Sequence, residues 1–189
     1  KLRNIMRPAV DLYVAIPSVV YGYIGLTILI PVVRNIFHVS NGYGIFVTAV
    51  ILGVMILPTI ISISEDALNG VPLPLEEASL ALGATYWQTL YRVIIPAAAP
   101  GILTSVVLAM ARAIGETMAV QMVIGNTPLF PSGLFTPTAT LTSDIVVEMG
   151  NTPFGSPWGN ALFLMALVLL VISLLMILAI KRIGARRYA

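Results

Sequence analysis

Residues 158–180 read WGNALFLMALVLLVISLLMILAI, a run of 23 positions without a charged side chain. An α-helix rises about 1.5 Å per residue and crosses the hydrocarbon core of a bilayer, about 30 Å thick, in about 20 residues. The run therefore predicts a transmembrane helix. A buried helix of a large soluble protein is the alternative, and the rest of the chain decides between the two.

Three further apolar stretches of similar length lie upstream, at residues 9–33, 43–63 and 100–125. Of all 189 residues, 58% are apolar and only 10% are charged, whereas soluble domains carry about 25% charged residues. This composition excludes an ordinary soluble enzyme, a disordered chain and a nucleic-acid binder with a basic surface. The chain has no cysteine, which excludes thiolate metal sites. We predict an all-α integral membrane protein with about four transmembrane helices.

The basic residues are distributed asymmetrically among the segments that connect these stretches. If the four helices alternate in direction, Arg34 lies alone on one side and eight bases lie on the other: Lys1, Arg3, Arg7, Arg92, Lys181, Arg182, Arg186 and Arg187. Because Lys and Arg accumulate on the cytoplasmic side of membrane proteins, both ends of the chain and the connection at residues 64–99 are predicted to be cytoplasmic. The turn at residues 34–42 and the proline-rich loop at residues 126–157 are predicted to lie outside.

The cytoplasmic connection at residues 64–99 is too long for a simple turn. Glu76 and Glu77 follow two prolines and suit the first turn of a helix, since acidic side chains favour its positive end. Gly83 predicts an elbow, and a second short helix is expected to end at Pro96. Two helices lying in the lipid interface are one interpretation. A docking element for a cytoplasmic partner fits better, because the first helix carries two acids and no base, a poor match to anionic lipid.

The first stretch combines Pro17 and Ser18 with Gly22 and Gly25. A proline inside a helix removes one backbone hydrogen bond and kinks the helix, while glycines permit close approach by a neighbour. Helix packing and the lining of a transport pathway are both open interpretations of this segment.

The connection also carries a sequence pattern. Glu77, Ala78, Ser79, Gly83 and Pro96, with Val93 and Ile95 at the intervening apolar positions, resemble the EAA loop of bacterial ABC-importer permeases. That pattern is Glu-Ala-Ala, three residues, Gly, nine residues, Ile, one residue, Leu-Pro. Ser79, Val93 and Ile95 are conservative departures from it. In that family the loop forms a coupling helix that docks into a groove on the ATP-hydrolysing subunit, which assigns Glu77, Ala78, Ser79, Gly83 and Pro96 to coupling.

Two other stretches are similar to the phosphate-specific (Pst) permeases, of the PstC branch. They are residues 15–22, AIPSVVYG, and residues 111–126, ARAIGETMAVQMVIGN, with TLTS at 140–143. The resemblance implies one partial permease domain at residues 1–189, with four helices of a six-helix, MetI-like core whose first two helices are absent. It further implies a multi-pass protein of a bacterial or archaeal cytoplasmic (inner) membrane.

The resemblance also implies the function and partners. The expected function is the permease of an ATP-driven importer for inorganic phosphate. Its expected protein partners are a PstA-like second permease, two PstB-like ATPases and a PstS-like extracytoplasmic phosphate-binding protein. The ATPases are expected to use ATP-Mg. The chain is also expected to contact membrane lipid and to bind no nucleic acid. This chain is expected to hold no cofactor and not to be an enzyme, because it contains no Gly-x-x-x-x-Gly-Lys-[Ser/Thr] phosphate loop. A permease for molybdate or sulfate and a non-transporting membrane scaffold are the alternatives.

The third stretch contains two charged residues, Arg112 and Glu116, four positions apart. In one continuous helix they would share a face, which Ser105 extends as part of a stripe of small residues. A charge at the bilayer centre costs about 2.5–3.5 kcal/mol on insertion scales, and a guanidinium fork suits an oxyanion. The predicted translocation pathway therefore comprises Arg112, Glu116, Pro17, Ser18 and Ser105. An ion pair that only fixes helix packing is the alternative.

The topology can be tested with single cysteines, since the chain has none of its own. A cysteine at Ser79 should react with an impermeant thiol reagent only from the cytoplasmic side, and a cysteine at Ser132 only from outside, because the eight-to-one distribution of bases fixes the orientation. Labelling is measured in intact cells and in inverted vesicles. Labelling of position 79 in intact cells would contradict the orientation.

Overall fold

The computed structural model of the chain describes residue 10 and residues 13–185, and within them the secondary structure is helical apart from one isolated β-bridge. Four helical runs are long and apolar enough to cross a membrane: Ser18–Phe37, Ile45–Asn69, Tyr86–Gly115 and Pro157–Ala179. The predicted all-α class with four candidate membrane helices is confirmed.

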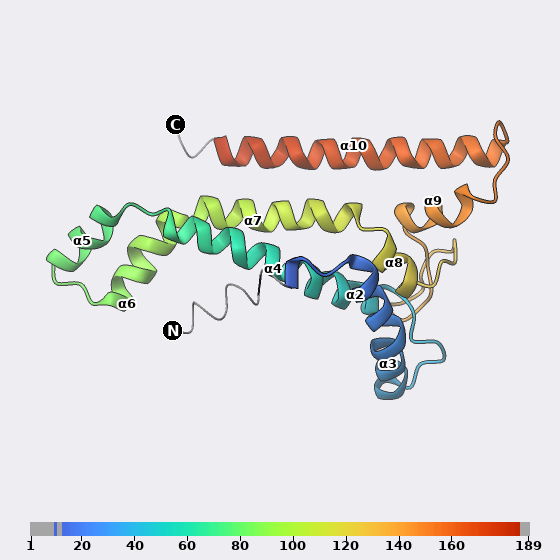
Figure 1. Ribbon diagram of the computed structural model, residues 1–189, viewed down its shortest axis with the longest axis horizontal. Helices are drawn as coiled ribbons and strands as arrows, with labels where there is room; N and C mark the ends of the chain where they lie inside the picture. Colours follow the sequence, from blue (N-terminus) through green and yellow to red (C-terminus); the bar gives the residue numbers. More distant parts are fainter. Residues whose placement is uncertain (1–9, 11–12, 186–189) are drawn as a thin grey trace.

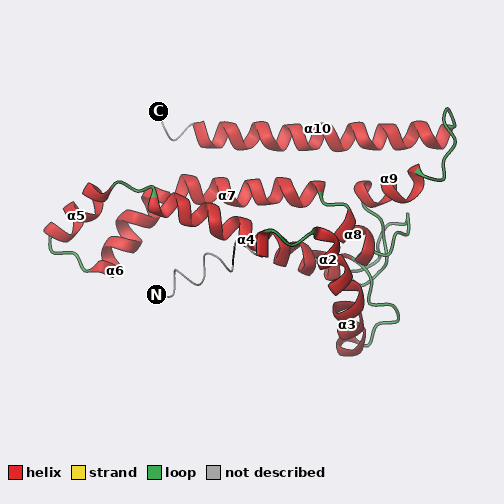
Figure 2. Cartoon of the chain, viewed as in Figure 1, coloured by secondary structure: helices red, strands yellow, loops and turns green. Residues whose placement is uncertain are grey.

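Three of the long helices lie lengthwise beside one another in Figure 1: α4 (Ile45–Asn69), α7 (Ile95–Gly115) and α10 (Pro157–Ala185). One end of this layer carries the short helices α5 (Leu73–Ala81) and α6 (Tyr86–Thr89) and the C-terminal end of α10. The other end carries α8 (Met118–Val123), α9 (Leu141–Met149) and most of the loops, drawn green in Figure 2. The two connections that were predicted to face opposite sides of a membrane therefore lie at opposite ends of the molecule.

The first membrane-spanning run consists of α2 (Ser18–Ile24), a π-helical turn η1 (Gly25–Leu29) and α3 (Ile30–Phe37). It packs against α4 and α8, and the buried core of the protein lies at this junction. The core side chains come from all three parts: Tyr21, Ile30, Val33, Val47, Ile51, Met55, Ala119 and Val123. The predicted role of the glycines in close approach is confirmed, because a Cβ atom at Gly22 would lie 3.0 Å from the Ala119 Cα, and one at Gly25 would lie 2.7 Å from the Val123 side chain.

The contact between α4 and α7 is made by small residues. Gly101 of α7 lies against Ala67 of α4 so closely that a Cβ atom at position 101 would overlap the Ala67 methyl group. One turn further along, the Ser105 Oγ lies 2.8 Å from the Ser64 Oγ. Ser105 and Ala109 are fully buried. Close backbone approach and hydrogen bonds between helices are what drive packing in lipid.

The helix boundaries correct the predicted ends of the cytoplasmic connection. Helix α4 continues to Asn69, and α6 runs through the π-helical turn η2 (Leu90–Ile94) into α7. Pro96 therefore does not end a helix. In the wider π turn the Ile95 N–H donates to the Leu90 carbonyl, five residues back, so the helix continues across the proline that would otherwise break it. The other π-helical turn, η1, also stands just before a proline, Pro31.

Two predictions about helix continuity are wrong. Helix α7 ends at Gly115, and Glu116 has an extended backbone with φ −72° and ψ 125°. The predicted helix at residues 100–125 is thus broken, and α8 is a separate short helix. Pro17 lies before α2, with φ −59° and ψ 140°, and does not kink a helix from inside. A proline suits this place because the first N–H groups of a helix have no intrahelical partner.

Helix α10 is the least enclosed of the long helices. Most of its large apolar side chains are exposed, among them Leu164, Leu167, Leu170, Leu174 and Leu178. The described chain touches it only along the face toward α7 and α9. The opposite face suits a lipid or a neighbouring transmembrane helix.

The contact at Gly101 can be tested with a matched pair of substitutions. Gly101→Ala should lower the unfolding temperature in detergent and reduce membrane expression, because overpacking costs about 1–3 kcal/mol. Gly53→Ala is the control, since a Cβ atom at that helical glycine would have no neighbour within 4 Å. Equal stability of the two variants would contradict the tight α4–α7 contact.

Candidate translocation and coupling elements

Arg112 is exposed, near the end of α7 that is remote from α5 and α6. Its Nη1 donates a hydrogen bond of 3.1 Å to the Thr59 Oγ1 on α4. The guanidinium is therefore held against α4 by a neutral hydroxyl, and among the described residues this is its one hydrogen-bond partner. A planar guanidinium with free donors can bind a tetrahedral or planar oxyanion.

Glu116 does not share a helical face with Arg112, because the helix ends before it. No ion pair joins these two side chains, both of which the structure describes. The Glu116 backbone is instead tied at both ends: its N–H donates to the Ala113 carbonyl at 3.2 Å, and its carbonyl accepts from the Thr142 Oγ1 at 3.2 Å. The predicted shared face of Arg112 and Glu116 is therefore wrong, and the side chain that holds the guanidinium is Thr59.

The other predicted pathway residues lie in different environments. Ser105 is fully buried between α4 and α7, where its hydroxyl contacts Ser64 and donates to the Ile102 carbonyl at 2.7 Å. Its position is that of a packing residue. Pro17 is exposed and Ser18 is half-buried at the start of α2.

Four of the five predicted coupling residues lie in the hairpin formed by α5 and α6, whereas Pro96 lies in the first turn of α7. Glu77 and Ala78 are exposed on α5, and no side chain of that helix is buried. On the second helix Trp87 and Tyr91 stack, with ring centroids 6.2 Å apart, and about two thirds of each is exposed. Leu82, at the end of α5, is 90% exposed. An exposed apolar and aromatic surface of this kind suits contact with a protein partner or with the lipid interface.

Gly83 forms the elbow between these helices. Its φ is +85°, and a Cβ atom built there would have no neighbour within 4 Å. The glycine is therefore required by its backbone conformation and not by a close approach. Helices often end on a glycine with positive φ, and Thr85 then starts α6 with a reciprocal capping box with Gln88.

Two hydroxyl residues of these elements were missed by the sequence reasoning. Thr59 holds Arg112, and Thr89 is fully buried with its Oγ1 2.9 Å from the Ser79 Oγ. A threonine in an apolar segment is compatible with a bond to its own helix, so neither carries a signal in one sequence.

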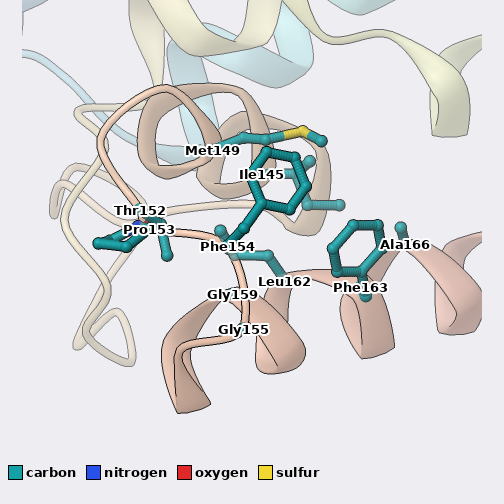
Figure 3. A pocket seen from close by; sticks show the side chains of 10 residues that line it. All are labelled: Ile145, Met149, Thr152, Pro153, Phe154, Gly155, Gly159, Leu162, Phe163 and Ala166. Atoms are coloured by element: carbon teal, nitrogen blue, oxygen red, sulfur yellow. The ribbon is translucent and has the colours of Figure 1, made fainter.

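The end of the molecule that carries α8 and α9 contains two hollows. One, between α9 and α10, is small and apolar and is lined by side chains such as Met149, Phe154 and Phe163 (Figure 3). The other is a wider hollow that the 128–131 loop, α4 and α9 line, and it includes Asp144. Burial and the nearby Glu148 carboxylate raise the pKa of Asp144. No cationic side chain lines either hollow, so Arg112 remains the oxyanion-binding candidate among the described residues.

The protein has several apolar helices, an exposed helix hairpin at one end and Arg112, hydrogen-bonded to Thr59, toward the other. This architecture is typical of a membrane transport subunit. The family model described as "Binding-protein-dependent transport system inner membrane component" matches residues 1–188. The chain belongs to this family.

Several similar proteins are known by name. "Probable ABC transporter permease protein YqgH" of Bacillus subtilis (strain 168) is 50% identical, and the match covers 98% of this chain and 60% of that protein. "Phosphate transport system permease protein PstC" of Mesorhizobium japonicum is 38% identical, with coverage of 96% and 61%. The "Probable phosphate transport system permease protein PstC" of Methanocaldococcus jannaschii is 33% identical, with coverage of 87% and 57%. The chain thus spans about three fifths of the length of these relatives.

The fold has a solved counterpart. A chain of the MetNI methionine ABC transporter, in an inward-facing conformation, superimposes with a TM-score of 0.71 and 24% sequence identity. The match covers 98% of this chain and 75% of that one. The expected MetI-like permease fold is confirmed, and this likeness bears on the fold alone.

The elbow at Gly83 gives a graded prediction. Gly83→Val should impair transport by this permease more than Gly83→Asn, because a β-branched residue is strained at positive φ while Asn tolerates it. The left-handed helical region costs an ordinary residue about 1–2 kcal/mol. The measurement is transport at equal membrane expression. Full activity of Gly83→Val would show that the elbow conformation is not needed.

Proposed function

We propose that the chain acts in the transmembrane permease subunit of an ATP-driven importer for inorganic phosphate. The observation that carries this function is the exposed hairpin of α5 and α6, whose residues 77–96 follow the spacing of the EAA loop and whose elbow glycine has the positive φ that such a turn needs. The names of the similar PstC proteins support phosphate as the substrate.

In the proposed mechanism ATP hydrolysis takes place on two partner ATPases, each docked by a permease hairpin. Leu82, Trp87 and Tyr91 supply apolar contact area, and Glu77 supplies a polar contact at the same surface. The remaining partners are a second permease, an extracytoplasmic phosphate-binding protein that delivers substrate to the end with α8 and α9, and the lipid of a cytoplasmic (inner) membrane. Both ends of the chain lie in the cytoplasm.

Phosphate passes Arg112 on its way. The guanidinium donors that do not bond Thr59 can each bond a phosphate oxygen, and the Thr59 hydroxyl fixes the angle at which they are presented. A neutral partner leaves the full positive charge available, which a carboxylate clamp would not. Glu116 lies at the break between α7 and α8 and acts in the path without a direct bond to Arg112, while Pro17 and Ser18 line it from the start of α2.

A permease for another oxyanion, molybdate or sulfate, is the second candidate, because a guanidinium binds all three anions. The direct experiment is uptake of radiolabelled phosphate by the full-length permease reconstituted with its partners. Excess unlabelled arsenate, molybdate and sulfate are then compared as competitors. Phosphate uptake that only arsenate suppresses supports the proposed substrate, and the absence of ATP-dependent uptake of any oxyanion favours a scaffold.

The role of Arg112 gives the next prediction. Arg112→Gln should abolish phosphate uptake without preventing assembly, because the substituted amide carries no charge. Thr59→Val should raise the apparent KM roughly tenfold, the order expected for one hydrogen bond to a charged group, and Thr59→Ser should restore it. Initial uptake rates at several phosphate concentrations provide the measurement.

Arg34→Gln is the matched control for this substitution. Arg34 is also an exposed arginine, but it belongs to α3, and its substitution should leave uptake unchanged. An Arg112→Gln importer that assembles and transports at the normal rate would show that Arg112 has a packing role and that the path follows another face.

A further inference from the structure

We propose that the hydrogen bond between Ser79 and Thr89 is a clamp that fixes α5 on α6, so that the coupling hairpin moves as one body with α7. This inference rests on the coupling role given to the hairpin above. It assigns Ser79 and Thr89 as positioning residues, which act through the geometry of the hairpin and not by touching substrate or ATP.

The hydrogen bond between Ser79 and Thr89 is buried at its Thr89 end, whereas most of the residues around it are exposed. The Ser79 Oγ and the Thr89 Oγ1 are 2.9 Å apart. Thr89 is fully buried, whereas Trp87 and Tyr91 on either side of it are 65% and 64% exposed. Within residues 73–94, all of which the structure describes, no other side-chain hydrogen bond crosses from α5 to the helix that follows it.

The other features of the hairpin constrain its angle only in part. No side chain of α5 is fully buried, so packing holds that helix only weakly. The elbow at Gly83 has no neighbour within 4 Å of a Cβ atom, and two backbone hydrogen bonds close it, from the Gly83 N–H to the Leu80 carbonyl at 2.9 Å and from the Ala84 N–H to the Ser79 carbonyl at 3.3 Å. Beyond the elbow itself, the bond between the two hydroxyl groups is the side-chain hydrogen bond that ties the helix that meets the ATPase to the helix that continues into the membrane.

The position of Thr89 along the chain adds to this argument. It is the last residue of α6, and the π-helical turn η2 begins at Leu90. A π turn inside a helix is frequently found at functional sites. The clamp lies on the hairpin side of that turn, so a push on α5 reaches α7 through Thr89 and is not absorbed at the elbow.

The test uses the full-length permease reconstituted with its ATPases, the second permease and the binding protein. ATP hydrolysed and phosphate taken up are measured together for Thr89→Val and for the double variant Ser79→Ala/Thr89→Val. Thr104→Val is the matched control, because the Thr104 Oγ1 bonds only the Pro100 carbonyl of its own helix, at 2.8 Å. The unfolding temperature of each complex is recorded as well.

Both hairpin variants should hydrolyse roughly fivefold more ATP per phosphate than the unmodified importer, the order expected when one neutral hydrogen bond is lost from an equilibrium. The double variant should recover the stability that Thr89→Val loses, since it leaves no hydroxyl unpaired, but it should remain uncoupled. A merely structural role predicts that coupling recovers with stability. A double variant with the normal ratio of ATP to phosphate overturns the clamp.

A physical readout separates this inference from the proposed function. Spin labels at Leu75→Cys and Tyr91→Cys report the distance between the two helices, and the distribution should broaden in the Thr89→Val background. If the unmodified importer moves no phosphate, the proposed function fails, while the label distances still decide whether the clamp exists. An unchanged distribution overturns it.

Discussion

The contact between α4 and α7 is the constraint on which the other parts of the structure depend. Gly101 lies on Ala67, Ser105 bonds to Ser64, and Arg112 reaches Thr59 along the same pair of helices. Lipid offers no hydrophobic gain for bringing two apolar helices together, so close backbone approach and hydrogen bonds across the contact must do it. Helix α10 packs on the outside of α7, and α7 carries the hairpin at one end and Arg112 toward the other.

Serine and threonine hydroxyl groups make many of the side-chain hydrogen bonds in the described part of this protein. In the hydrocarbon core an unpaired polar group costs several kcal/mol, and here serine and threonine side chains satisfy one another or a nearby carbonyl. The Thr142 hydroxyl does this at the helix break, where it bonds to the Glu116 carbonyl. Among the described residues, one buried side-chain atom is left unpaired, the Oδ1 of Asn126, at a position with φ +47°. A break in a membrane helix is tolerated where protein groups satisfy the freed backbone.

Much of the fold could be predicted from sequence, because the length and composition of an apolar run determine whether it can span a bilayer. The elbow at Gly83 also follows from a local signal, a glycine between two short helices. The helix ends could not be predicted in this way, because a proline does not always end a helix. A π turn stands just before Pro31 and Pro96, and α4 and α7 also continue through Pro58 and Pro100. No proline lies at the break between α7 and α8 at Glu116, so the sequence did not indicate that the helix ends there. Spacing alone therefore placed Arg112 and Glu116 on one face, and tertiary contacts with Thr59 and Thr142 decided otherwise.

The continuity of the third membrane run determines how the two ends of the protein can influence each other. Residues Tyr86–Gly115 form one helical run of 30 residues, about 45 Å long at 1.5 Å per residue. Had Pro96 ended a helix, the hairpin would be joined to α7 by a loop, and a displacement of the hairpin would be lost in that loop. With the π turn in place, the backbone hydrogen bonds continue from Thr89 into α7, so a rotation of the hairpin must rotate α7 or slide it against α4. Since Arg112 is held on α4 through Thr59, such a movement changes the hydrogen bond between Thr59 and the guanidinium.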